Sequence, residues 1–377
     1  MSLIIDIHAL QTLPPSLINR DDTGAPKSAI YGGVPRQRVS SQSWKRAIRK
    51  DFQDSFDPAS VGYRTKHVVE LVVDKVKEFG GESWTVERAE ERVAQAFKVV
   101  KIKLVEPKTK EDDTKEEKRR VFQQTGYLLF LSPRQIENLA RAIVDADGEN
   151  LKKGDVEKLI DTEHSVDIAM FGRMVADDAA FNVDASVQVA HAIGIHESEP
   201  EFDFFTAVDD VVADHEETGA GMMGTVQLMS STLYRFATLD VESLAENLGD
   251  RDAAVTAAVA FVRSFVTSLP TGKQNTFAHN TLPELVYVAV RDDRSISLVN
   301  AFENPVAAEN NVGRRRAGAE ALAAEERDIE TKYGFTPKQA FVVGLGGLDD
   351  PFSDLADATT LPELDDRIRA AISGEGA

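Results

Sequence analysis

The chain has 377 residues, of which 42% are hydrophobic and 28% charged, a balance typical of a folded globular protein rather than a disordered or fibrous one. It contains no cysteine, which excludes disulfides, thiolate zinc sites and a cysteine nucleophile and favours a reducing, cytoplasmic setting. A formal net charge of −20 argues against a surface that attracts nucleic acid everywhere, so any such contact must be local. We see neither a signal peptide nor a long apolar run, and expect no contact with a membrane.

The start of the chain predicts a strand, a loop and an amphipathic helix. Residues 3–10 are apolar and rich in β-branched side chains, which predicts a strand and a central sheet. Between residues 11 and 39 the many prolines and glycines predict a long loop. From Ser40 the spacing of apolar and basic residues predicts a helix capped by serine. Its apolar face comprises Trp44, Ala47, Ile48 and Phe52.

The remainder alternates predicted helices and strands without an internal repeat. The helices are expected at about 133–144, 241–248, 251–268 and 314–332, and the strands at about 99–104, 121–131, 165–174, 183–195, 225–238, 285–290 and 339–344. Two stretches look like insertions: the charged residues 106–120 and the acidic, glycine-ended residues 196–224. This pattern predicts one α+β domain that carries insertions.

The strongest local signal is the segment Arg36–Lys50, which holds six basic residues and no acidic one. Serine hydroxyls, a glutamine amide and free backbone N–H groups meet at the predicted helix start, where the helix dipole favours anions. This combination suits a phosphodiester backbone. The alternative is a solvated basic face paired with the surplus carboxylates of the chain.

A second signal is the apolar group Phe204–Val208 inside the acidic insertion. Aromatic side chains in such a segment can wedge between bases or stack on them. Equally, they can pin the insertion to the body of the protein or to a neighbouring subunit. The sequence leaves both interpretations open.

Three further patterns are weaker. Gly219–Gly224 matches the dinucleotide fingerprint, but an acidic run precedes it and a strand pattern follows it, so hinge glycines are the better interpretation. His191 and His196 would point to opposite faces of a strand. The pairs Asp177–Asp178 and Asp209–Asp210 could hold magnesium, yet such pairs arise by chance in an acidic chain. We expect no metal site and no cofactor.

A set of longer motifs extends over most of the chain. It comprises Leu17–Asp22, Ala29–Gly33, Arg38–Ala47, Val166–Ala169, Gly172–Met174, Val189–Ile193, Phe205–Asp210, Tyr234–Ala237, Glu246–Gly249, Gly272–Gln274 and Asn300–Glu303. These motifs resemble the CasC family, the CRISPR-RNA-binding backbone subunit of the type I-E CRISPR Cascade complex. Residues 75–165 and those beyond about 305 match the family poorly.

The resemblance implies an α+β fold shaped like a hand. An RRM-like (ferredoxin-like) palm would occupy residues 1–195, with a helical fingers insertion at about 52–165. Residues 196–224 would form an extended thumb, and residues 225–377 the rest of the palm and a C-terminal helical region. Copies of the chain would form a filament along the CRISPR RNA with the other Cascade subunits, as a cytoplasmic ribonucleoprotein of antiviral defence.

The same resemblance implies particular contacts. The RNA backbone would be held by Arg20, Lys27, Ser40, Gln42, Lys45, Arg46 and Arg49. A displaced base would lie against Met174, Phe204, Phe205, Thr206 and Val208. Lys152 and Lys153 would correspond to a fingers helix that contacts target DNA.

The resemblance also implies that the subunit is not an enzyme, because base pairing between the guide and the target DNA strand carries the specificity. The alternative is a metal-dependent RNA nuclease of a related CRISPR effector complex, whose backbone protein uses an aspartate.

Overall fold

The computed structural model describes residues 2–107, 121–175, 177–207, 222–307 and 313–373. The chain divides into two compact units. Residues 1–51, 187–241 and 255–377 form the first, which we call the sheet unit, and residues 52–186 and 242–254 form the second, the helical unit. Among the described residues, no helix is both long and apolar enough to cross a membrane.

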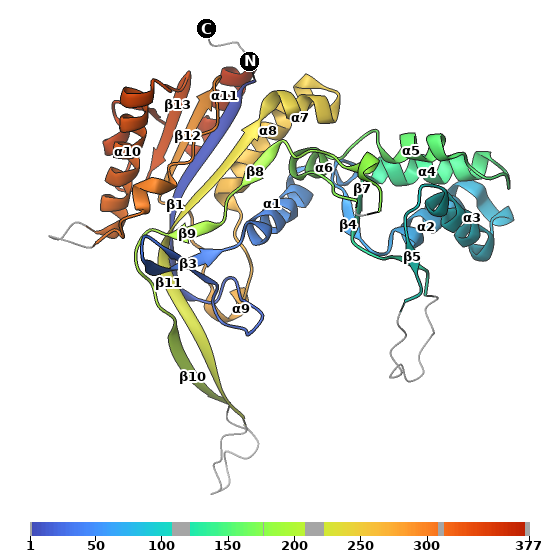
Figure 1. The fold of residues 1–377 in the computed structure, drawn as a ribbon, viewed down its shortest axis with the longest axis horizontal. Helices are drawn as coiled ribbons and strands as arrows, with labels where there is room; N and C mark the ends of the chain where they lie inside the picture. Colours follow the sequence, from blue (N-terminus) through green and yellow to red (C-terminus); the bar gives the residue numbers. More distant parts are fainter. Residues whose placement is uncertain (1, 108–120, 176, 208–221, 308–312, 374–377) are drawn as a thin grey trace, which may run out of the picture. The chain divides into compact units, whose positions relative to one another are not determined.

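In the described part of the chain, one mixed sheet of ten strands organises the sheet unit (Figure 1). Its order is β14 (Asp357–Ala358), β13 (Gln339–Gly344), β12 (Leu285–Arg291), β1 (Ile4–Ser16), β11 (Met222–Asp240), β9 (Ala192–Gly194), β3 (Val34–Val39) and β2 (Ser28–Tyr31). Off this path, β8 (Val187–Val189) and β10 (Glu201–Ala207) both pair with β11. The described pairs are antiparallel except that of β13 with β14. The α+β prediction is therefore confirmed.

The loop predicted for residues 11–39 is largely wrong. β1 continues to Ser16. Its two prolines lie between Leu13 and Ser16, where the register with β11 shifts, so neither proline has to donate a ladder hydrogen bond. The glycine pair Gly32–Gly33 has φ values of +58° and +79° and turns β2 directly into β3, as a two-residue hairpin requires. These breakers mark turns within the sheet rather than an irregular segment.

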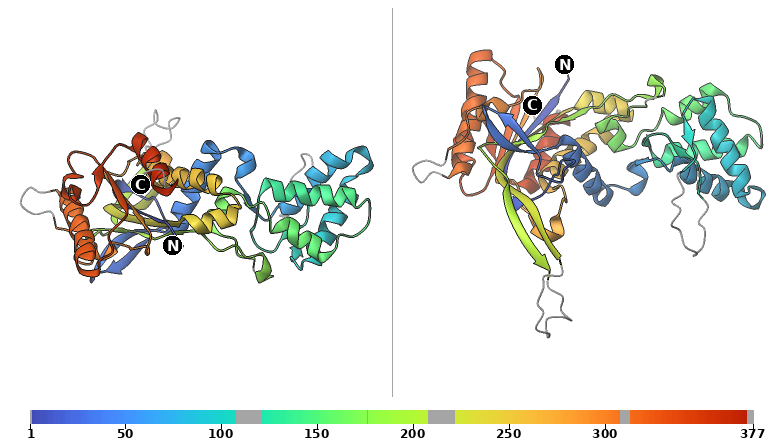
Figure 2. Two further views of the ribbon diagram at one scale, coloured as in Figure 1. Left: turned by 90° about the horizontal axis from the view of Figure 1, so that it is seen from above. Right: turned by 60° about the horizontal axis from the view of Figure 1, so that its bottom comes forward.

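Helices cover both faces of the sheet. Their bounds are α1 (Ser41–Ser55), α8 (Arg251–Thr267), α9 (Gln274–Phe277), α10 (Arg314–Tyr333) and α11 (Leu361–Ser373), with short 3-10 turns at Val299–Phe302 and Asp350–Phe352. On one face Tyr234 and Tyr287 pack with residues of α10, the orange helix that lies along the sheet in both views of Figure 2. On the other face Leu13 and Leu233 pack against Trp44 of α1. The alternation of β1 and β11 sends neighbouring residues to these two cores.

The helical unit has a core of its own, built by α2 to α5. Its helices are α2 (Val68–Gly80), α3 (Val86–Val99), α4 (Pro133–Asp145), α5 (Lys153–Ile160), α6 (Val166–Phe171) and α7 (Val241–Leu248), with 3-10 turns at Pro58–Ser60, Gly81–Ser83 and Ala179–Phe181. Its short strand pairs are β4 (Tyr63–Thr65) with β7 (Leu129–Leu131), and β5 (Leu104–Val105) with β6 (Gln124–Thr125). The predicted start of α4 is confirmed: Ser132 and Gln135 form a reciprocal capping box around Pro133.

Two predicted strands of the helical unit are wrong. Residues 165–174 contain α6, where the buried carboxylate of Asp167 accepts hydrogen bonds from the Ser165 hydroxyl and the Gly62 amide. A six-residue helix buried on several sides shows no clear period in its sequence. At residues 99–104, α3 runs to Val99 and the strand is confined to β5.

Candidate nucleic-acid interface

α1 presents two different faces, as its sequence predicts. Trp44, Ile48 and Phe52 are buried, while Gln42 and Arg46 on the opposite side are exposed. Lys45 and Arg49 are half-buried at the margin. Partial burial lowers the pKa of Lys45, because water stabilises the charged ammonium. The basic side of α1 therefore lies on the surface of the sheet unit.

Asn19 holds the predicted residues of the β1–β2 connection against the start of α1. The Ser40 amide donates a 2.9 Å hydrogen bond to the side-chain oxygen of Asn19. The Lys27 amide donates to the backbone carbonyl of Asn19 (3.0 Å), and the Arg38 amide donates to the Lys27 carbonyl (2.9 Å). Because Arg20 follows Asn19 directly, these bonds bring Arg20 and Lys27 to the end of the helix that carries its free N–H groups.

The charges around this position are positive. The Arg38 guanidinium lies 3.3 Å from the Nδ1 atom of His191. Desolvation lowers the pKa of His191, and the positive charges of Arg38 and Lys27 lower it further. Residues 23–50 contain no acidic side chain, although the exposed Asp21 and Asp22 directly follow Arg20. Positive charge is therefore concentrated at the start of α1 in a chain that is acidic as a whole.

One basic residue of the segment does not belong to this surface. Arg36 is completely buried and donates hydrogen bonds to the carbonyls of Gly194 (2.9 Å), Phe302 (3.1 Å) and Glu303 (3.1 Å). A guanidinium with five donors can satisfy several carbonyls at once. Arg36 therefore stabilises the sheet unit, and it should not be counted with the other five basic residues. Ser40 is also mostly buried.

β10 and the first part of β11 form a two-stranded ribbon, seen at the bottom of Figure 1. Phe204 lies opposite Thr225 and Phe202 opposite Gln227, while Thr206 lies opposite Met223. Because strand residues alternate, these six side chains share one face. Phe202, Phe204 and Met223 are 72%, 63% and 65% exposed. The ribbon thus displays an apolar face.

The opposite face of the ribbon is more closely packed. Phe205 pairs with Gly224, and a Cβ atom added at Gly224 would lie 2.5 Å from the Phe205 ring. The glycine therefore provides the space that the ring fills. Phe204 and Phe205 point to opposite faces, so the two phenylalanines cannot act together on one base. Val208 and Gly219–Gly221 lie outside the described residues.

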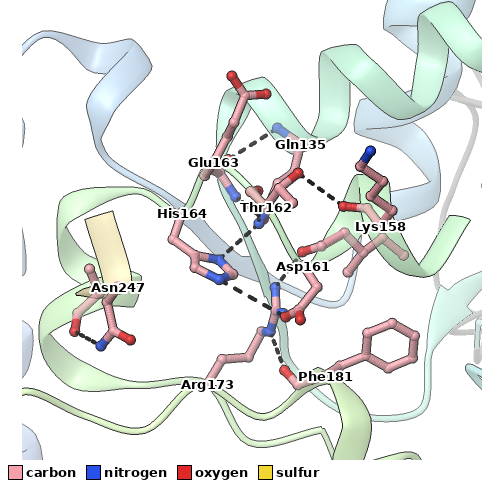
Figure 3. A network of polar contacts seen from close by, with 12 residues as sticks. Gln135, Lys158, Asp161, Thr162, Glu163, His164, Arg173, Phe181 and Asn247 are labelled. Atoms are coloured by element: carbon pink, nitrogen blue, oxygen red, sulfur yellow. Dashed lines mark hydrogen bonds and ion pairs between the residues drawn. The ribbon is translucent and has the colours of Figure 1, made fainter. Parts of the chain in front are cut away.

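Met174 belongs to the helical unit, where it is 79% exposed. Arg173 beside it is buried and donates hydrogen bonds to the carbonyls of Phe181 (2.7 Å) and Ile160 (3.0 Å) and to the Asp161 carboxylate (3.0 Å). Figure 3 shows this network beneath His164. Burial lowers the pKa of Arg173 to about 10. The backbone that presents Met174 is thus fixed by a buried cation.

Lys152 and Lys153 are both exposed at the start of α5. Lys153 pairs with Glu157 at 3.0 Å, which offsets the unfavourable position of a cation at a helix N-terminus. Both side chains can reach a polyanion from this position.

The described residues of the weaker patterns that form hydrogen bonds take structural roles, whereas Asp209 and Asp210 lie outside the described residues. His196 is buried, with Nδ1 2.7 Å from the Glu197 carbonyl and Nε2 accepting from the Thr232 amide. Asp177 accepts from the Lys103 amide and Asp178 from the Ala180 amide. Over the described ranges, no group of three acidic or histidine side chains is arranged to hold a metal ion. The absence of a metal stays a prediction.

Sequence reasoning missed Asn19, Phe202 and Met223. The alternation of Phe202 with Phe204 was a usable signal for the shared face, whereas nothing local pointed to Asn19. A helix start rich in basic residues, together with a protruding apolar ribbon, is typical of a protein that binds a single-stranded nucleic acid.

The family follows from comparison with known proteins. The model of the CT1975-like protein family matches residues 5–367, and the chain belongs to this family. It is similar to a chain of a solved structure described as a CRISPR RNA-guided surveillance complex, pre-nicking, with 32% identity and a TM-score of 0.79 over 98% of this chain and 100% of that chain. A chain of another structure, described as a CRISPR RNA-guided surveillance complex, is 28% identical with a TM-score of 0.70 over 98% and 99% of the two chains. No curated protein matches significantly. The resemblance to the CasC family is confirmed.

Proposed function

We propose that this chain is a non-catalytic, CRISPR-RNA-binding backbone subunit of a type I-E Cascade complex. The observation that carries the proposal is the group of basic residues at the start of α1, where residues 23–50 contain no acidic side chain and Asn19 holds Arg20 and Lys27 beside the helix N-terminus in a chain of net charge −20. The similar chains of guide-bound surveillance complexes support it.

In this proposal the sheet unit is the RRM-like palm, the helical unit is the fingers and the ribbon is the thumb. Gln42, Lys45, Arg46 and Arg49 contact phosphates, which fixes the RNA without reading its sequence. Base pairing between the RNA and the target DNA strand then supplies specificity. Contacts between successive copies are head-to-tail, so they propagate as a filament on which the other Cascade subunits assemble in the cytoplasm.

The apolar face of the ribbon has a separate task. Phe204 and Thr206, extended by Phe202 and Met223, lie against a base that is displaced from the guide strand, since aromatic faces stack on any base. Met174 of the helical unit contacts a base of the RNA as well. Lys152 and Lys153 contact the phosphates of target DNA.

The test is the salt dependence of RNA binding. Each lost phosphate contact should reduce the slope of log K against log salt by about 0.7 for a single strand. Replacing Lys45, Arg46 and Arg49 with alanine should therefore reduce the slope by about 2 and weaken binding most at low salt.

A matched variant removes three positive charges elsewhere in the sheet unit, at Lys332, Lys338 and Arg367, whose side chains pair with acidic residues. It should leave the slope unchanged. Equal slopes for the wild type and the α1 variant would refute the proposal.

A metal-dependent RNA nuclease is the competing function. Assembled complex, complementary RNA and magnesium distinguish the two. Cleavage that an aspartate substitution abolishes would contradict the non-catalytic proposal, whereas intact RNA after prolonged incubation agrees with it.

A further inference from the structure

We propose that the loop of residues 270–281, which contains α9, is a second contact for the RNA backbone, with Lys273 as its charged group. The inference rests on the proposed function and extends its site. About one residue in six is acidic, 63 of 377, yet residues 253–283 contain none, and the next longest acid-free stretch is residues 23–50.

The stretch 253–283 approaches the segment just before Arg20 at Gly272. A Cβ atom added at Gly272 would lie 2.1 Å from the Ile18 carbonyl oxygen and 3.1 Å from that of Leu17. Only a glycine allows two backbones to approach so closely. Lys273 follows this contact by one residue and Arg20 by two. Figure 1 shows α9 beside the connection that follows β1.

A buried arginine ties the loop to α1. The Arg235 guanidinium lies 3.7 Å from the centre of the Trp44 ring of α1 and donates a 2.6 Å hydrogen bond to the side-chain oxygen of Gln11. The amide of Gln11 in turn donates to the Thr281 carbonyl at 2.7 Å. One cation therefore fixes both the basic helix and the end of the loop.

The loop is also closed upon itself. His279 is completely buried, with Nε2 3.2 Å from the Pro270 carbonyl, and Gln274 donates to the Asn280 side chain at 2.7 Å. Lys273 and Ala278 bracket the single turn with φ values of +53° and +45°. Residues other than glycine adopt such values only when the surrounding structure imposes them. The backbone at the exposed Lys273 is thus fixed, which limits the backbone entropy lost when the side chain meets a phosphate.

An RNA strand fits this surface better than a protein partner does. Exposed polar side chains, Lys273, Asn275 and Thr276 among them, surround the turn, and such groups suit a phosphate better than an apolar protein surface. A phosphodiester strand that runs past Arg20 and the start of α1 needs only local positive charge.

Three substitutions at one position test the inference in the full-length protein with a single-stranded RNA oligonucleotide. Lys273→Gly permits the left-handed backbone and removes the charge, Lys273→Ala removes the charge alone, and Lys273→Arg keeps it. The first two should weaken binding about three- to tenfold at low salt and reduce the salt slope by about 0.7, the value for one phosphate. Lys273→Arg should bind like the wild type. Thermal unfolding shows whether each variant folds.

The controls separate the two proposals. Lys338→Ala removes one charge from the same unit, where Lys338 pairs with Asp292 at 3.1 Å, and should change nothing. If Lys273→Gly keeps the wild-type slope while the Lys45, Arg46 and Arg49 variant loses it, the loop inference fails and the proposed function stands. If neither variant changes the slope, both fail. A Lys273→Arg variant as weak as Lys273→Gly would also overturn the inference.

Discussion

Removal of the Arg235 side chain should lower the free energy of unfolding of the sheet unit. Its guanidinium is buried between Trp44, at 3.7 Å, and Phe265, at 4.4 Å, and donates hydrogen bonds to Gln11 and to the Phe265 carbonyl. Burial lowers its pKa to about 9, which still leaves the group charged at neutral pH. Arg235→Ala therefore breaks two stacking contacts and leaves two buried acceptors without a donor.

The size of the effect can be worked out from these contacts. Stacking on desolvated rings contributes about 2 kcal/mol in total, and an orphaned buried acceptor costs about 1 to 3 kcal/mol. With two acceptors orphaned, the expected loss in the free energy of unfolding is at least about 4 kcal/mol, in the range of other large truncations in cores. Arg235→Met, which keeps apolar packing, should lose about half as much.

The assay uses the two tryptophans of the chain, one in each unit. In a Trp84→Phe background, the fluorescence of Trp44 reports urea unfolding of the sheet unit alone. Arg263→Ala, an exposed arginine of α8 paired with Asp365, is the control and should cost less than about 1 kcal/mol. A loss at Arg235 no greater than that at Arg263 would refute the reasoning.

Three further predictions concern other contacts. Glu326→Ala leaves the buried guanidinium of Arg291 without its closest carboxylate. It should lower the free energy of unfolding in urea by about 3 to 5 kcal/mol, more than Glu326→Gln does. Equal losses for the two variants would contradict a role for the charge. Burial lowers the pKa of His164 to about 4, so the unfolded chain takes up this proton first as the pH falls. Stability present above about pH 6.5 should therefore be lost toward pH 4, by about 3 kcal/mol, and His164→Asn should flatten this slope; parallel pH profiles would exclude it. Gly224→Ala should displace the Phe205 ring and speed amide exchange in the β10–β11 ladder; unchanged exchange would show that the ring adapts without strain.

Patterns that depend on neighbouring residues could be predicted from the sequence. The faces of α1 follow from helical spacing, because Trp44 and Ile48 are buried and Arg46 is exposed. The start of α4 follows from Ser132 and its capping partner. Spacing and capping are local, so a single sequence contains them.

Other features depend on contacts between distant parts of the chain. Arg235 and Gln11 are separated by 224 residues, and the close approach of Gly272 to Ile18 has no local signature. Burial of Arg36 could not be distinguished from exposure by composition, since its partners are backbone carbonyls. Such contacts decide which basic residues face outward. A count of charges in the sequence does not predict this.

The number of residue pairs in the β10–β11 ribbon is constrained more strictly than the amino acids that form them. β11 runs without a break from the ribbon into the sheet, and its first seven residues pair with β10 instead of β1. At about 3.3 Å per residue, these pairs extend about 23 Å beyond the sheet. One pair more or fewer between the sheet and Phe204 would turn this side chain to the opposite face of the ribbon. Homologous ribbons should therefore differ in length by steps of two pairs, so that reach can change while the apolar face keeps its direction.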